Sequence, residues 1–156
     1  MTELNPSDLT QEQKNELDKR LDAHKNQEDT NTDAFAFLDE LKSKNIKLAI
    51  LSNKADELTK KIGNSLFPNY FEIVQGLKSE LTKKPNPVAA IEISKNLGYS
   101  PEEVLYVGDS DIDMQTAKNA NMFAVGVLWG YRPKEELIVA GAQAIIEHPL
   151  ELLKLL

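Results

Sequence analysis

The chain has 156 residues and no cysteine, so disulfide bonds, thiolate metal sites and cysteine nucleophiles are excluded. Its formal net charge is −7, from 25 acidic and 18 basic residues, and it has no basic stripe, so nucleic acid and anionic membranes are not expected partners. No apolar run has the length of a membrane span or the character of a signal peptide, so we expect a cytoplasmic protein with one main domain.

The first 30 residues differ in composition from the rest of the chain. They are polar, and the spacing of Thr10 and Gln13 is typical of a capping box that starts a helix. The apolar face of that helix would hold little more than Leu17 and Leu21. Because so small an apolar face cannot stabilise a helix alone, we expect this segment to pack on something else or to fray.

From residue 32 onward, helical and strand patterns alternate along the chain. Strands separated by helices predict βαβ units, and therefore an α/β fold with a largely parallel sheet. Helical patterns cover residues 34–41, 58–66, 114–120 and 135–139, a further helix ends at Leu97, and a terminal helix starts at Pro149; strand patterns cover residues 46–51, 71–74, 104–107, 123–128 and 144–146.

Three carboxylates follow the apolar strand over residues 104–107, at every second position. They are Asp109, Asp111 and Asp113, and Gly108 precedes them. A carboxylate at the C-terminal end of a parallel strand lies where open α/β sheets bind ligands, and hard oxygen ligands suit Mg²⁺. The structural alternative is an acidic helix N-terminus, in which Asp111 and Asp113 cap the following helix.

Two further polar segments occupy comparable places. Ser52 and Asn53 follow a predicted strand, and Lys84 lies in a loop before a helix. Because parallel strands end at one edge of a sheet, a hydroxyl, a cation and the carboxylates Asp109 and Asp113 can converge there, as binding of a phosphate ester requires. Considered singly, Ser52 fits an ordinary turn or cap serine, and Lys84 fits a surface lysine.

Taken in order, residues 51–54, 83–87 and 107–113 resemble the second, third and fourth motifs of the haloacid dehalogenase superfamily. They are most similar to its phosphoglycolate phosphatase branch, and the similarity extends over about residues 33–156. Asn121 stands where members usually have glycine, and asparagine is the next-best residue for a left-handed backbone. The resemblance implies a Rossmann-like parallel sheet with flanking helices.

The resemblance also implies roles for five residues. Ser52 would bind the transferring phosphoryl group with help from Asn53, and Lys84 would stabilise both the phosphate and the nucleophile. Asp109 would bind Mg²⁺, and Asp113 would support the metal from behind or through a water molecule.

One motif of the superfamily has no counterpart before Ser52. That first motif is a central strand ending in Asp-x-Asp and then Gly-Thr, whose first aspartate attacks phosphorus and whose second is the acid and base. Asp109 and Asp111 also form Asp-x-Asp, but in that role they would leave the metal site. The resemblance therefore implies that residues 1–30 are a remnant of the helical cap and hinge, and that residues 31–156 are a core lacking its first, central strand.

These observations leave three hypotheses about function. The first is a Mg²⁺-dependent phosphatase of small phosphorylated metabolites that uses an aspartyl-phosphate but is inactive alone, because the attacking aspartate is missing. Its exposed strand edges would recruit a complementing N-terminal segment or a second copy. The second is a non-catalytic module that binds phosphate or Mg²⁺ or associates with other chains. The third, a receiver domain phosphorylated at Asp109, fits the parallel sheet but not the Ser52 and Lys84 motifs.

Overall fold

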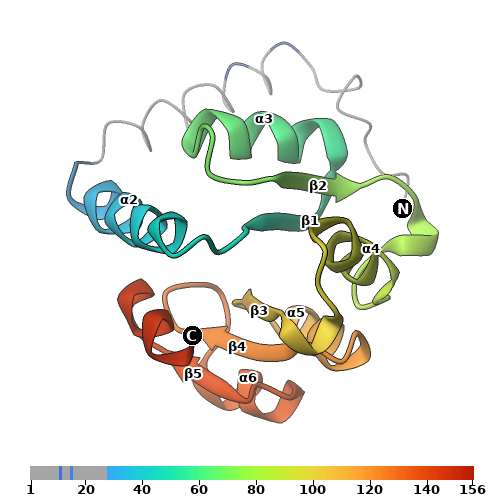
Figure 1. The fold of residues 1–156 in the computed structure, drawn as a ribbon. Helices are drawn as coiled ribbons and strands as arrows, with labels where there is room; N and C mark the ends of the chain where they lie inside the picture. The colour runs from blue at the N-terminus through green and yellow to red at the C-terminus, as the bar shows by residue number, and fades with distance from the viewer. Residues whose placement is uncertain (1–10, 12–14, 16–27) are drawn as a thin grey trace. The chain divides into compact units, whose positions relative to one another are not determined.

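The computed structural model describes Gln11, Asn15 and residues 28–156, and the chain divides into two units, Met1–Lys78 and Ser79–Leu156 (Figure 1). Gln11 and Asn15 are helical, but the rest of the predicted N-terminal helix lies outside the described residues. The predicted boundary after residue 30 therefore stays a prediction. Within the described part, no helix combines the length and the apolar character needed to cross a bilayer.

The first unit contains a two-stranded parallel sheet and two described helices. Strand β1 (Ala49–Ala55) pairs with β2 (Ile73–Leu77), and helix α3 (Asp56–Leu66) connects them. The preceding helix α2 (Glu28–Ser43) buries Leu38 and Leu41. The helical pattern predicted over residues 34–41 is confirmed.

Strand β1 carries an irregularity in its pairing with β2. Leu51 lies opposite Gln75 and Ala55 opposite Leu77, so three residues of β1 face a single residue of β2. The strand was predicted to end at Leu51, and this is wrong by four residues. The prediction took the end of the apolar run as the end of the strand. The backbone instead continues as a bulged strand through the polar residues that follow, and such bulges are common beside functional sites.

The second unit contains a three-stranded parallel sheet in the order β3-β4-β5. Its strands alternate with helices, as the sequence predicts, and the predicted terminal helix is of the 3₁₀ type. The elements in chain order are η2 (Glu80–Thr82), α4 (Val88–Leu97), η3 (Pro101–Glu103), β3 (Leu105–Gly108), α5 (Asp111–Asn119), β4 (Phe123–Val127), α6 (Lys134–Ala140), β5 (Ala144–Ile146) and η4 (Pro149–Leu155).

The core of the second unit lies between β4 and the helices α5 and α6 (Figure 1). Val125 of β4, Met114 of α5 and Leu137 of α6 have no exposed surface. Burial of each large apolar side chain contributes about 2 kcal/mol to the free energy of folding. This packing fixes the C-terminal end of β3 against the start of α5, where the acidic motif lies.

The two sheets confirm an α/β fold with parallel strands. Among the described residues, β1 has β2 as its strand partner, and β3 has β4. β3 is therefore an edge strand of the sheet of the second unit.

Candidate functional site

The acidic motif forms the junction between β3 and α5. Ser110 is the N-cap of α5, and its Oγ accepts a hydrogen bond from the Asp113 N–H at 3.2 Å. The same hydroxyl donates to Asp113 Oδ2 at 3.0 Å. The cap predicted for an aspartate is therefore made by Ser110, and it orients Asp113 toward the end of β3.

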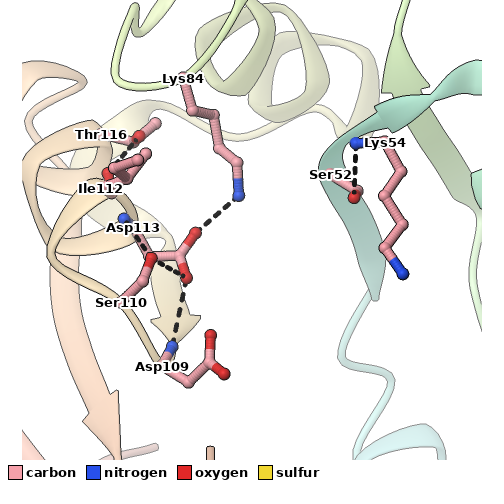
Figure 2. A network of polar contacts seen from close by, with 8 residues as sticks. All are labelled: Ser52, Lys54, Lys84, Asp109, Ser110, Ile112, Asp113 and Thr116. Carbon is pink, nitrogen blue, oxygen red and sulfur yellow. Dashed lines mark hydrogen bonds and ion pairs between the residues drawn. The ribbon is translucent and has the colours of Figure 1, made fainter. Parts of the chain in front are cut away.

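Lys84 forms an ion pair with Asp113 (Figure 2). Lys84 Nζ lies 2.6 Å from Asp113 Oδ1, and the two side chains are only 11% and 12% exposed. The other oxygen of Asp113, Oδ2, accepts a hydrogen bond from the Asp109 N–H at 3.2 Å. Asp113 therefore connects the lysine to the backbone of Asp109, and charged groups held this way in a partly buried place interact more strongly than they would in water.

Steric contact with Asp113 explains why position 108 of the motif is a glycine. A Cβ atom at Gly108 would lie 2.3 Å from the Cβ of Asp113 and 2.6 Å from its Oδ2. Any other residue at this position would force α5 away from the end of β3. Glycine is therefore required for Asp113 to reach the Asp109 N–H.

The three carboxylates of the motif do not converge. Asp109 Oδ2 accepts a hydrogen bond from the Tyr131 N–H at 3.1 Å, whereas Asp111 Oδ1 lies 4.0 Å from Arg132 Nε. No group of three or more acidic or histidine side chains that could hold a metal occurs among the described residues. Mg²⁺ in phosphate-handling sites is typically held by one or two carboxylates with waters and substrate oxygens, so a site based on Asp109 fits this donor set.

A buried phenol lies close to the ion pair. Burial raises the pKa of Tyr106, the negative charge of Asp113 raises it further, and Thr116 partly opposes the shift. The Tyr106 hydroxyl has no hydrogen-bond partner among the described residues. The nearby Thr116 hydroxyl donates to the Ile112 carbonyl at 2.7 Å. Tyr106 therefore stays a neutral phenol behind Asp113.

Ser52 and Asn53 belong to the first unit, in the irregular part of β1. Ser52 Oγ accepts a hydrogen bond from the Lys54 N–H at 3.1 Å (Figure 2). Asp56, at the start of α3, accepts one from the Gly76 N–H at 2.9 Å and so ties the end of β1 to β2. These bonds give the Ser52 segment a defined backbone conformation.

The structure thus brings three of the five predicted site residues together in the second unit: Lys84, Asp109 and Asp113. The other two are neighbours in the bulge of the first unit. Sequence reasoning missed Ser110 and Tyr131. A serine before an acidic helical turn is a recognisable capping signal, but a backbone N–H leaves no signal in the sequence.

Comparison with known proteins agrees with this geometry. A model of the family described as haloacid dehalogenase-like hydrolase matches residues 1–127. The chain belongs to this family. Among curated relatives of this chain, a phosphoglycolate phosphatase of Aquifex aeolicus is 42% identical over 95 residues, covering 60% of this chain and 45% of the relative. A protein of Caldanaerobacter subterraneus, provisionally named pyrophosphatase PpaX, is 34% identical over 126 residues, covering 80% of this chain and 57% of the relative.

Solved structures give the same result. A crystal structure from Lactobacillus delbrueckii, provisionally named a phosphoglycolate phosphatase, has a TM-score of 0.71 and 37% sequence identity. The match covers 75% of this chain and 49% of that structure's chain. The haloacid dehalogenase-like chain spans about half the length of the relatives that it matches.

Proposed function

We propose that this haloacid dehalogenase-like chain carries the phosphate-binding and magnesium-binding part of a phosphomonoester hydrolase. The contact of Lys84 with Asp113, directly beside Asp109, is the observation that carries the proposal. It joins the third and fourth motifs of the family, 29 positions apart in the sequence, through a 2.6 Å ion pair. An ammonium group and a carboxylate held side by side are suited to a phosphate and its counter-ion.

The proposed roles are those that the resemblance to the family implies, and the chemistry of each group suits its role. The Ser52 hydroxyl and the Asn53 side chain hold phosphoryl oxygens, and the Lys84 ammonium neutralises part of their charge. Asp109 holds Mg²⁺, which would withdraw further charge from the phosphoryl group. Asp113, whose two oxygens are engaged by Lys84, Ser110 and the Asp109 N–H, supports the metal from behind or through water.

The attacking carboxylate is a separate requirement of this mechanism. It would bond to phosphorus while the bond to the alcohol oxygen breaks, and water would then release phosphate from the aspartyl-phosphate. Asp111 is poorly suited to act as the acid beside an attacking Asp109, since it faces Arg132. We therefore propose that a complementing segment or a second chain, paired with an exposed strand edge, supplies the Asp-x-Asp pair.

The substrate class is a small phosphorylated metabolite. Its support is the set of relatives named phosphoglycolate phosphatase and pyrophosphatase. The Lys84 ammonium and the Ser52 hydroxyl would recognise the phosphate group and not the remainder of the molecule. A cytoplasmic location stays a prediction.

A second candidate function is association without catalysis. Among the described strands, β3 lies at the edge of its sheet, and its Val107 side chain is 42% exposed. Unpaired edges of apolar strands are sites at which another strand can add. A residual fold of this kind could bind phosphate or Mg²⁺ without turning a substrate over.

Hydrolysis of a generic aryl phosphate by the purified chain with Mg²⁺ separates these possibilities. We expect no turnover by a chain that circular dichroism shows to be folded, because no Asp-x-Asp motif precedes Ser52 in this sequence. Turnover that is abolished in both Asp109→Asn and Ser52→Ala would contradict this expectation and place a nucleophile within the chain.

Binding of inorganic phosphate in the presence of Mg²⁺, measured by calorimetry, tests whether the chain carries the proposed phosphate-binding site. We expect Lys84→Met to weaken binding at least tenfold, and Lys83→Met to leave it unchanged. Equal binding by the two variants would remove Lys84 from the proposed site.

A further inference from the structure

The loop that follows β4 contacts Asp109 through its backbone. We call residues 129–132 the clamp loop; it contains Trp129, Gly130, Tyr131 and Arg132. The Tyr131 N–H donates to Asp109 Oδ2 at 3.1 Å, and the Arg132 N–H donates to the Asp109 carbonyl at 3.2 Å. Two successive backbone donors therefore bind one aspartate.

Side-chain burial does not explain where this loop lies. Tyr131 is 93% exposed and Trp129 is 52% exposed. Arg132 Nε lies 3.7 Å from Glu136 and 4.0 Å from Asp111, and exposed pairs of this kind contribute little to stability. The contact with Asp109 is therefore the specific interaction of the clamp loop.

Gly130 makes the contact possible. A Cβ atom at this position would lie 2.2 Å from the Cβ of Asp109 and 2.3 Å from its Oδ2. Real Cβ atoms do not approach other atoms so closely, so a larger residue at position 130 must displace the Asp109 side chain or the loop. Only glycine lets the backbone lie against the carboxylate.

Hydrogen bonds engage the backbone of Asp109 and one of its two carboxylate oxygens. Its N–H donates to Asp113, its carbonyl accepts from Arg132, and its Oδ2 accepts from Tyr131. Among the described residues, no hydrogen bond reaches Oδ1. The side chain is held in one orientation, with one oxygen engaged and the other available to a cation.

We infer that the clamp loop is the positioning element of the metal site, with Gly130 and Tyr131 as positioning residues that present Asp109 Oδ1 to Mg²⁺. This inference rests on the proposed role of Asp109 as the magnesium ligand. Groups that orient a metal ligand commonly change metal affinity 10-fold to 100-fold when they are altered. The clamp loop therefore contributes to metal affinity although none of its own side chains binds the metal.

The chain contains its own reporter for this contact. Trp129 is the single tryptophan and adjoins Gly130, so its fluorescence is expected to change when Mg²⁺ binds at Asp109. Titration of the full chain with Mg²⁺ should give a saturable signal that Asp109→Asn removes. Gly130→Ala should raise the dissociation constant at least tenfold.

Gly98→Ala is the matched control. Gly98 ends α4 with φ +89°, and a Cβ atom there would meet nothing within 4 Å. Alanine at position 98 strains the backbone and lowers thermal stability, but it should leave the dissociation constant for Mg²⁺ unchanged. A tenfold loss of affinity in this control would mean that any destabilised variant loses the metal, and would overturn the inference.

Amide exchange tests the clamp first in the unaltered protein and then in one variant. The Tyr131 N–H should exchange more slowly than an unbonded amide, and Asp109→Ala should remove that protection. Exchange of the Tyr131 N–H at the rate of an unbonded amide would overturn the inference. An unaltered Mg²⁺ affinity in Gly130→Ala would overturn it as well. Mg²⁺ binding that survives in Asp109→Asn would instead overturn the proposed metal site, and this result can be told apart from a failed clamp by the exchange data.

Discussion

At the scale of single residues, the contact between Lys84 and Asp113 is the strongest described electrostatic interaction of the candidate site. Both side chains are about nine-tenths buried, and both Asp113 oxygens are hydrogen bonded. Removing Lys84 leaves the mostly buried Asp113 carboxylate without this counter-charge, and only the hydrogen bonds from Ser110 and the Asp109 N–H remain to stabilise it. The pair therefore matters for stability as well as for the proposed chemistry.

We predict that Lys84→Met lowers the free energy of unfolding by about 3 kcal/mol. Urea unfolding followed by circular dichroism measures this quantity. Lys83→Met is the control, because its side chain is 46% exposed and its pair with Glu80, at 3.9 Å, lies at the surface, so its effect should stay below about 0.5 kcal/mol. Equal losses in the two variants would show that the contact with Asp113 contributes nothing specific.

At the scale of elements, the junction of β1, α3 and β2 depends on Asp56. Its Oδ1 accepts from the Gly76 N–H at 2.9 Å, and its Oδ2 lies 2.7 Å from Lys60 Nζ. Burial alone would raise the pKa of Asp56, but the hydrogen bonds from Lys60 and Gly76 and the charges of Lys60 and Lys78 outweigh it and hold the pKa below its usual value. The junction is therefore stabilised by the ionised carboxylate.

The sign of the pH effect follows from this lowered pKa. The stabilisation is fully present above the pKa of an unfolded aspartate, about 3.9, and is lost as the pH falls through the lower folded-state pKa. As the pH falls from about 7 to about 3, the free energy of unfolding should therefore decrease less in Asp56→Asn than in the unaltered chain.

Chemical unfolding at several pH values measures this difference, and Glu57→Gln serves as its control. Glu57 is exposed in the same helical turn, and its side chain makes no hydrogen bond with the described residues. This control should keep the pH dependence of the unaltered chain. An unaltered pH dependence in Asp56→Asn as well would contradict the role of the junction.

At the scale of the whole molecule, the described strands form two parallel sheets, one in each unit. β3 pairs with β4 and so ends the sheet of the second unit, and Val107 leaves 42% of its surface exposed. An apolar edge strand of this kind invites pairing with another strand, which both candidate functions use.

We predict that the chain self-associates at high concentration and that Val107→Lys reduces this association, since a lysine on an edge strand disfavours strand addition. Size-exclusion chromatography with light scattering measures the mass. Val139→Lys is the matched control, because Val139 is 89% exposed but lies on α6. A similar reduction in both variants would mean that general surface hydrophobicity, and not the β3 edge, drives association.

The sequence by itself determined the elements that depend on local chemistry. Asn45 and Asn121 have φ of +58° and +59°, and Gly98 ends α4 in the left-handed conformation, as their positions predict. The capping box of Ser100 and Glu103 is also present. Such signals are readable because each involves neighbours within a few residues.

Only the tertiary structure decided how the site is built. The bulge of β1 depends on its register with β2, and the apolar run could not predict it. The Tyr131 N–H reaches Asp109 across 22 positions of sequence, and the close approach that allows it depends on Gly130. A backbone donor is the same in every residue except proline, so its partner is set by the packing of β3 against β4 and not by residue type.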